Sequence, residues 1–415
     1  MKSSRPAGMQ AFTLLWAGQV ISMLGSAMTW FAFTIWAWKA TGSVTALAII
    51  SFSAYLPPAL LSPLAGTFVD RWNRKLVMML SDAGTALGTL FALILYATNN
   101  LQIWHVYVIA ILAGSFTAFQ YPASTAAMTT MLSKEQYVRA NGMLGLSAAL
   151  SGILAPVFAA TLLGVMNMSG IMVIDLITYF VAFGTLLYIK IPKPGISEVG
   201  SQSRGTIWQE TRFGFQYICK RPSLYSLAAL FMVANIFLAI GATLMAPKVL
   251  IETGNNASAL ATVQSVGALG GVIGGTVLSL WGGPRRRIHG VLAGGISVCL
   301  LGVAWLGWSR TLAFLAIGSF FFSFFEPLIE GNNLSIWQSK VEADVQGRVF
   351  SARQLLVQLP YLFGTLLAGY LADTSAIARI LILAGIGGAL VFLFGYLSSN
   401  VRDSEILLPD AAELL

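Results

Sequence analysis

Twelve apolar runs, each long enough to cross a lipid bilayer, make up most of this chain of 415 residues. The hydrocarbon core of a bilayer is about 30 Å thick, and a helix of about 20 apolar residues spans it. The runs cover residues 11–37, 43–69, 76–97, 103–131, 141–165, 168–189, 223–247, 258–281, 289–308, 311–338, 349–372 and 376–399. Only 10% of the residues are charged, whereas about a quarter are charged in soluble proteins. We therefore predict an all-α polytopic membrane protein with twelve transmembrane helices.

Short sequence landmarks occur twice, once in each half of the chain. Gly66-Thr-Phe-Val is followed by Trp72 and a basic cluster, and Gly275-Thr-Val-Leu is followed by Trp281 and three arginines. An internal repeat of this kind indicates two similar structural units in tandem. We therefore predict two six-helix bundles, joined by a cytoplasmic linker with an amphipathic helix and followed by a cytoplasmic tail. The predicted segments are residues 1–190, 191–222, 223–400 and 401–415.

The positions of the basic residues indicate how the chain is oriented in the membrane. All of the 24 Lys and Arg residues except Lys39, Lys248, Arg310 and Arg379 fall on the same side of the predicted spans as the two termini. Basic residues accumulate in the cytoplasmic loops of membrane proteins. We therefore predict an integral protein of the plasma (inner) membrane with both termini in the cytoplasm. Loops that face anionic lipid account for the net charge of +8, so no nucleic-acid partner is expected.

Several classes of function lack the residues that they would need. The chain has two cysteines and two histidines, which argues against a disulfide framework and against a metal site. It contains no glycine-rich phosphate loop that ends in Lys-Ser or Lys-Thr, and no catalytic constellation stands out. We therefore expect no enzyme, no metal and no cofactor. The expected partners are a small-molecule substrate, protons and membrane lipid, and the chain is expected to be a monomer.

A polar stripe runs along the predicted tenth span, which is otherwise rich in Phe, Leu and Ile. Its members recur every three or four residues and are Ser319, Ser323, Glu326, Glu330 and Asn333. Glu326 and Glu330 share one face of the helix, where two desolvated carboxylates repel each other, and Pro327 weakens the helix between them. We therefore expect at least one of these acids to exchange protons near neutral pH. The alternative is a structural pairing with arginines of neighbouring helices.

Two aspartates lie inside predicted spans of the first half. Asp82 is about two turns into the third span, and Asp175 is about two turns in from the outer end of the sixth. An ionised aspartate at the centre of a bilayer costs at least ~2.5–3.5 kcal/mol, so each should pair with a cation or bind a proton. For Asp82, Arg348 and Arg353 are partners within topological reach. Both aspartates are therefore candidates for proton coupling or for structural ion pairs.

The loop between the second and third spans resembles a known family signature. Its pattern Gly66-x-x-x-Asp70-Arg71-x-x-Arg74-Lys75 is similar to the signature loop of the major facilitator superfamily, as is the arrangement of twelve spans in two halves. The resemblance implies a cytoplasmic latch that holds one conformation. The implied members are Gly66, Asp70, Arg71, Arg74, Lys75 and Arg348. The alternative is a solvated positive loop, which explains the basic residues but neither the acid nor the glycine.

Three further stretches resemble the macrolide-efflux branch of the drug:proton antiporters in that superfamily. They are Trp16-Ala-Gly-Gln19, Val69-Asp-Arg-x-x-Arg-Lys75 and Gly347-Arg-Val-Phe-Ser351. In the fifth span, Ser151-x-x-x-Ala155-Pro156 is similar to the antiporter motif of exporters, with Ser and Ala where that motif has glycines. The resemblance implies transport by alternating access between the two bundles.

Polar side chains within the spans are the candidates for lining a substrate cavity. Gln19 begins a helical stripe that continues through Ser22, Ser26 and Thr29, although Ser and Thr also suit hydrogen bonds between packed helices. Gln120 suits either a substrate contact or a bridge between helices. The full set of candidates is Gln19, Ser26, Gln120, Asn235, Asn333, Gln354, Gln358 and Tyr361.

These features together predict a secondary active transporter. The preferred substrate is an amphipathic, drug-like compound of the macrolide type, exported in exchange for protons. Two alternatives stay open, namely export of a siderophore or lipid and uptake of a small nutrient by proton symport. An anionic nutrient would need a cation in the cavity, and none stands out within the spans.

Overall fold

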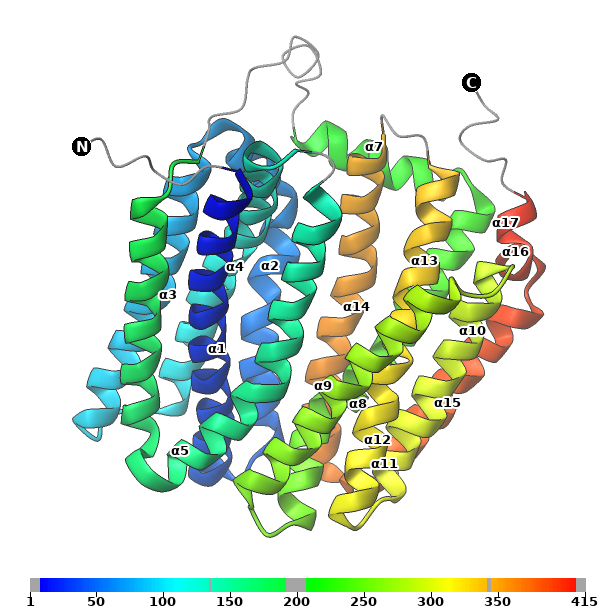
Figure 1. Ribbon diagram of the computed structural model, residues 1–415. Coiled ribbons are helices and arrows are strands. Elements are labelled where there is room, and N and C mark those ends of the chain that lie inside the picture. The colour runs from blue at the N-terminus through cyan, green and yellow to red at the C-terminus, as the bar shows by residue number, and fades with distance from the viewer. Residues whose placement is uncertain (1–7, 134–135, 192–206, 342–344, 408–415) are drawn as a thin grey trace. The chain divides into compact units, whose positions relative to one another are not determined.

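The computed structural model of the protein describes residues 8–133, 136–191, 207–341 and 345–407, which form helices without any β-strand in these ranges (Figure 1). The helices before residue 191 are α1 (Gly8–Thr41), α2 (Val44–Arg71), α3 (Arg74–Ala97), α4 (Ile103–Met131) and α5 (Tyr137–Tyr188). Those after residue 206 are α7 (Ile207–Cys219), α8 (Pro222–Glu252), α9 (Ala257–Trp281), α10 (Arg287–Ser297), the π-helix η2 (Val298–Ala304), α11 (Trp305–Trp308), α12 (Leu312–Phe324), α13 (Glu326–Lys340), α14 (Gln346–Thr374), α15 (Ile377–Leu397), α16 (Ser399–Arg402) and α17 (Ser404–Leu407).

The helices confirm the predicted polytopic fold. Among the described residues, 11 helical stretches are long and apolar enough to cross a membrane. The longest of these, α5, leaves helical geometry at Asn167, whose φ is 59° and ψ −177°. Asn tolerates positive φ better than most residues, so the chain turns there between two spans. The two parts of α5 match the predicted fifth and sixth spans. When α5 is counted as two spans, the 11 stretches among the described residues correspond to the twelve predicted runs.

Contacts divide the chain into two compact units. The first unit comprises residues 1–41 and 53–205, and the second comprises residues 42–52 and 206–415. The first turns of α2 therefore group with the second unit, where Thr45 Oγ1 donates to Asp373 Oδ2 of α14 at 2.5 Å. The domain boundaries predicted at residues 190 and 223 stay predictions. The sequence pattern does not predict that residues 42–52 group with the second unit.

In the first unit, α1 lies along α5, and α3 packs against α4 and α5 (Figure 1). Small residues allow this close approach. A Cβ atom on Gly18 of α1 would overlap the side chain of Thr185, and one on Gly25 would overlap that of Thr178. Lipid supplies no hydrophobic drive between helices, so close packing through such small residues is what holds the bundle together.

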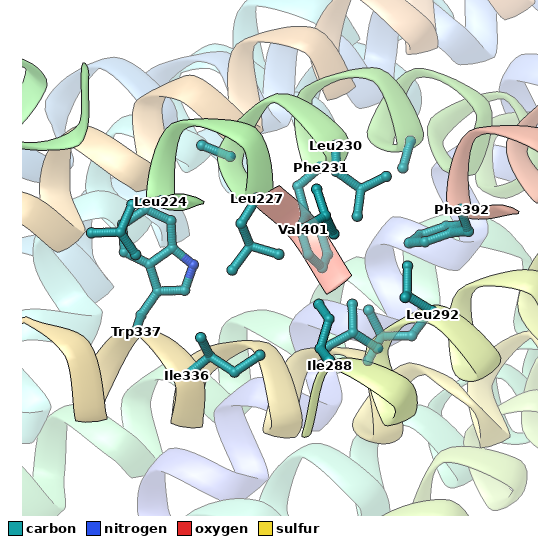
Figure 2. Close-up of a cluster of buried hydrophobic side chains, with 14 of the residues drawn as sticks. Leu224, Leu227, Leu230, Phe231, Ile288, Leu292, Ile336, Trp337, Phe392 and Val401 are labelled. Carbon is teal, nitrogen blue, oxygen red and sulfur yellow. The ribbon is translucent and has the colours of Figure 1, made fainter. Parts of the chain in front are cut away.

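The second unit is built around α8, which packs against α14 and α15. Its core is a cluster of buried apolar side chains, of which Figure 2 shows Leu224, Leu227 and Phe231 of α8 meeting Ile336 and Trp337 of α13. Trp337 is fully buried. The neighbouring pair of α9 and α12 approaches closely through glycines of α9, because a Cβ atom on Gly270 or Gly274 would overlap backbone oxygens of α12.

The linker helix α7 lies across the end of α14 in this second unit (Figure 1). A Cβ atom on Gly214 would overlap the backbone oxygen of Arg348, so this crossing requires glycine on α7. Ile218 on the same helix is fully buried. The predicted amphipathic linker helix thus buries its apolar face against the protein. Residues 192–206 of the predicted linker lie outside the described residues.

The end of the described chain docks onto the same unit. The carboxylate of Glu405 on α17 accepts hydrogen bonds from the backbone N–H groups of Arg287 and Ile288, each at 3.2 Å, at the start of α10. Unpaired N–H groups at a helix start favour an anionic acceptor. Lys340 Nζ, from the end of α13, donates to the backbone oxygen of Glu405 at 2.6 Å. Part of the predicted tail, up to residue 407, is therefore ordered structure.

Candidate functional site

A cavity of about 670 Å³ lies inside the first unit, between α1, α3, α4 and α5. Ligand pockets for drug-sized molecules have volumes of about 300–1,000 Å³. Six aromatic residues line it, namely Phe12, Trp16, Trp30, Phe116, Tyr121 and Tyr179. Its polar lining residues are Gln19, Ser22, Ser26, Ser81, Asp82, Thr85, Thr117, Gln120, Ser124, Thr125, Asn141 and Ser147. The described lining contains one carboxyl group and no lysine or arginine.

Asp82 of α3 is the carboxyl group of this cavity, and two glutamine amides hold it. Gln19 Nε2 of α1 donates to Asp82 Oδ2 and Gln120 Nε2 of α4 donates to Asp82 Oδ1, each at 3.0 Å. Gln120 Nε2 also lies 3.0 Å from Gln19 Oε1, so the three side chains form a closed group. Asp82 is 7% exposed, and no cation pairs with it among the described residues.

This group brings together three residues that the sequence predicts separately. Gln19, Gln120 and Ser26 line this cavity, and contact of any of them with a substrate stays a prediction. Arg353, a predicted partner of Asp82, instead contacts Glu330. Gln120 Oε1 is buried without a hydrogen-bond partner in the described structure, which leaves an acceptor beside the carboxylate. The site therefore offers negative charge, a free acceptor and aromatic surface to a ligand.

Asp175 of α5 lies beside this cavity but does not line it, and it is 1% exposed. Ser26 Oγ of α1 lies 3.2 Å from its Oδ1, and Thr89 Oγ1 of α3 donates to its Oδ2 at 3.2 Å. Within the described residues, only neutral groups contact the carboxyl. The two predicted intramembrane aspartates therefore occupy different surroundings, one at the cavity and one buried behind it.

The two glutamates of the tenth span also differ from each other. Glu330 Oε2 lies 3.4 Å from Arg353 Nη2 of α14, and the Arg353 side chain is only 14% exposed. The same guanidinium lies over the ring of Trp337, 5.6 Å from its centroid. Glu326 has no ion pair or hydrogen bond among the described residues. The pairing favours the structural alternative for Glu330, and a proton-coupling role for either acid stays a prediction.

The helix is interrupted next to Pro327, where the sequence predicts a weakened helix. α12 ends at Phe324 and α13 begins at Glu326, and the hydrogen bond from Phe325 N to Phe321 O is stretched to 3.4 Å. Proline has no backbone N–H, so Pro327 cannot donate the helical hydrogen bond to the carbonyl group four residues before it. Glu326 consequently sits at the first turn of a new helix.

The remaining cavity candidates lie in the second unit and do not line the described cavity. Asn235 Nδ2 donates to Val357 O at 3.0 Å, and Asn333 is fully buried, with its Oδ1 accepting from Trp337 Nε1 at 3.2 Å. Both asparagines therefore bind neighbouring groups of their own unit. Gln354 is exposed and Gln358 and Tyr361 are half-buried. Substrate contact by any of these residues stays a prediction.

The described part of the predicted latch ties helix ends together within the first unit. Arg74 Nη1 donates to Ala126 O of α4 at 2.6 Å, and Lys75 Nζ donates to Leu187 O at 3.1 Å and Ile189 O at 2.8 Å at the end of α5. At the end of α5, the Lys75 cation binds carbonyl groups that lack an intrahelical donor. The side-chain surroundings of Gly66, Asp70 and Arg71 lie outside the described residues, and Arg348 lies over the ring of Phe213 at 5.7 Å. A latch that controls conformation stays a prediction.

Comparison with known families decides the class of protein. The family model described as Major Facilitator Superfamily matches residues 15–365. The chain belongs to the major facilitator superfamily. It is therefore a multi-pass membrane transporter of the secondary type and not an enzyme.

Two curated relatives match this transporter over most of its length. Macrolide efflux protein A of Streptococcus pyogenes is 27% identical over 386 residues, which cover 90% of this chain and 92% of that protein. Macrolide efflux protein A of Enterococcus faecalis is 27% identical over 330 residues, which cover 77% of this chain and 98% of that protein. Among solved structures, a bacterial homologue of the iron transporter ferroportin in its inward-facing state matches with a TM-score of 0.67 at 14% identity, over 93% of this chain and 98% of that one. This last likeness supports the fold alone.

Several residues of the transporter's cavity carry no polar signal in the sequence. Phe12, Trp16, Met23 and Trp30 line it together with Gln19 and Ser26, all from α1. These six positions recur every three or four residues, which is the spacing of one helical face. The polar stripe of α1 therefore lies on a face on which four of these six residues are apolar, and the helical spacing alone places those four beside Gln19 and Ser26.

The different surroundings of Glu326 and Glu330 predict different effects of neutralising them. Glu330→Gln should destabilise the transporter by about 1 kcal/mol, because it leaves the mostly buried Arg353 without its counter-charge. Glu326→Gln should leave thermal stability unchanged, since no described partner is lost. Thermal unfolding of the detergent-purified variants measures both. Adding Arg353→Met to Glu330→Gln should restore part of the lost thermal stability. If all of these variants melt at the same temperature as wild type, Glu330 and Arg353 do not form a stabilising pair.

Proposed function

We propose that this transporter exports an amphipathic organic cation of the macrolide type in exchange for protons. The observation that carries the proposal is the carboxyl of Asp82, held in an aromatic cavity by two neutral amides and by no cation among the described residues. A carboxylate in such surroundings is stabilised by a cationic ligand or by a proton. Export, proton exchange and the macrolide class are all parts of the proposal.

The cavity walls suit the apolar body of such a ligand. Trp, Tyr and Phe rings attract a cation through their π-faces, and each favourable contact contributes about 0.5–2 kcal/mol. Trp16 Nε1 donates to Met143 O at 2.7 Å, which fixes that ring at the cavity wall. A large macrolide needs only to place its amine-bearing part in this space. An anionic nutrient is disfavoured, because the described lining offers it no lysine or arginine.

Competition for one carboxyl would couple substrate to protons. Asp82 can neutralise a ligand cation or hold a proton, but not both at once. The substrate would therefore leave when a proton arrives, as the transporter passes between its two access states. Major facilitators alternate access by rocking their two halves around a central site, and we assign that motion to this transporter. We further propose that both termini face the cytoplasm at the inner membrane, with the latch on that side.

The relatives support the choice of substrate class. Two proteins named for macrolide efflux cover most of this chain, and the resemblance in Trp16-Ala-Gly-Gln19 includes two of the cavity residues. The proposed substrate class is an amphipathic amine.

A substrate panel in cells that lack their own efflux pumps tests this function. We expect expression of the transporter to lower the accumulation of amine-bearing macrolides and of aromatic cations such as ethidium. A protonophore should restore their accumulation, because it removes the proton gradient. Accumulation of the active compound above that of control cells would reverse the direction of transport. Efflux that is indifferent to the protonophore would contradict proton coupling.

A further inference from the structure

Asp175 is a buried carboxyl that the proposed substrate site does not use. The side chains that α1 and α3 bring to it are Ser26, Thr29 and Thr89, which are all uncharged. The ionisable groups on this side of the bundle are Tyr179 on its own helix, which Ser26 joins to Asp175, and Asp82 on α3, which lines the cavity together with Tyr179. No described cation pairs with it. An ionised carboxylate buried in this way, with only hydroxyl donors, is costly inside a membrane.

The hydroxyl groups around Asp175 suit a carboxyl that gains and loses a proton. A hydroxyl both donates and accepts, so it can serve either form, whereas a cation or a backbone N–H serves only the anion. Thr29 is 2% exposed, and its hydroxyl is one of the groups that face the carboxyl. When Asp175 is protonated, its O–H needs an acceptor, and Thr29 Oγ1 is one.

A hydrogen-bonded path joins Asp175 to the cavity. Ser26 Oγ lies 3.2 Å from Asp175 Oδ1 and 2.9 Å from Tyr179 Oη, and both Ser26 and Tyr179 line the cavity. A proton on a cavity water can bind the Tyr179 oxygen while the hydroxyl hydrogen of Tyr179 passes to Ser26 and that of Ser26 passes to Asp175. Each hydroxyl ends neutral, and the net change is one proton moved from the cavity to the carboxyl.

We propose that Asp175 is a second proton site, so that the transporter exchanges two protons for each monovalent cation, one at Asp82 and one at Asp175. This inference rests on the proposed function and adds a ratio to it. Exchange of two protons for one cation moves one net charge across the membrane in each cycle. Transport should then respond to the membrane potential as well as to the pH gradient. With Asp175 permanently neutral, the exchange becomes one for one and moves no net charge.

Proteoliposomes test this ratio with ethidium, a permanent cation, as the probe. A potassium diffusion potential set with valinomycin, at equal pH on both sides, should drive wild-type transport. In Asp175→Asn this drive should fall at least tenfold, while a pH gradient still drives transport and the affinity for ethidium stays within about threefold. A merely structural role of Asp175 would change both kinds of drive together. An unchanged response of Asp175→Asn to potential would overturn the second site.

Further variants test the hydrogen-bonded path to Asp175, and further ion gradients test which ion binds there. If Asp175→Asn does not fold, Tyr179→Phe serves instead, since it keeps the carboxyl and removes a hydroxyl of the path. It should slow potential-driven transport measured at saturating ethidium, where a change in affinity at the cavity does not limit the rate, and an unchanged rate would overturn the path. Thr34→Val is a matched control on α1, because Thr34 Oγ1 only donates to Trp30 O of its own helix, and it should leave potential-driven transport unchanged.

A sodium gradient provides a separate test of the ion that binds at Asp175. If a sodium gradient drives transport at constant pH, Na⁺ and not a proton binds there, and the assignment is overturned. Failure of wild-type transport under every gradient would count against the proposed function itself.

Discussion

Replacing Asp82 by Asn should abolish efflux driven by a pH gradient and weaken binding of a cationic substrate by about tenfold to a hundredfold, or about 1.4–2.8 kcal/mol. Asn keeps the shape of the side chain. Its oxygen can accept from one glutamine, and its NH2 group can donate to the other once that amide turns its oxygen inward, so the cavity should keep its geometry. What is lost is the negative charge that attracts the ligand cation and the group that takes up the proton. Equilibrium binding to purified protein and transport in proteoliposomes measure the two losses separately.

A matched Asp→Asn change outside the cavity controls this experiment. Asp403 lies beyond the last span, with its Oδ2 3.1 Å from Arg402 Nη2 at the protein surface. The guanidinium of Arg402 lowers the pKa of Asp403 below its usual value, so this carboxyl stays ionised at neutral pH. Asp403→Asn should leave substrate affinity and coupling unchanged. Wild-type coupling in Asp82→Asn would contradict the assignment of the cavity carboxyl.

Replacing Gly274 by Ala should destabilise the second unit by about 1–3 kcal/mol. The added Cβ atom would overlap the backbone oxygen of Phe324, the last residue of α12. A backbone oxygen cannot rotate away as a side chain can, so α9 and α12 must move apart. Because Phe324 lies just before the helix break at Glu326, that movement should also disturb the first turn of α13. Thermal unfolding of the detergent-purified variant measures the loss.

The adjacent glycine is a built-in control for this prediction. A Cβ atom on Gly275 would come no closer than 3.9 Å to Pro327 Cγ, which is an ordinary contact. Gly275→Ala should therefore melt at the wild-type temperature or above it, since Ala favours helix over Gly by up to about 1 kcal/mol. Equal destabilisation by both substitutions would mean that the close approach of α9 to α12 is not what Gly274 provides.

The fold follows largely from local patterns in the sequence, because every span must satisfy its own backbone in lipid. The predicted run at 103–131 and the helix α4 (Ile103–Met131) have the same bounds. The turn at Asn167 also falls between two predicted runs, at 165 and 168. Such features depend on the chain's own hydropathy and turn chemistry, and neighbouring helices do little to change them.

The candidate site can be predicted from the sequence only in part, because it depends on how neighbouring helices are rotated and shifted against one another. Gln19, Asp82 and Gln120 are each recognisable as polar residues in apolar spans, yet nothing in their spacing along the chain shows that they meet. The pair of Glu330 with Arg353 is of the same kind, since the two residues come from different helices whose relative rotation the sequence does not specify. Periodicity shows which face of a helix is polar, and tertiary packing decides what that face contacts.

The central claim is that the charge of Asp82 recognises the charge of the substrate. Binding of an amine-bearing macrolide and of its N-oxide, which carries no net charge, should be measured on purified wild type and on Asp82→Asn. The account predicts that wild type prefers the cation by about tenfold or more and that Asp82→Asn binds both compounds with similar affinity. The same preference for the cation in both proteins would contradict the account, because the discrimination would then come from elsewhere in the transporter.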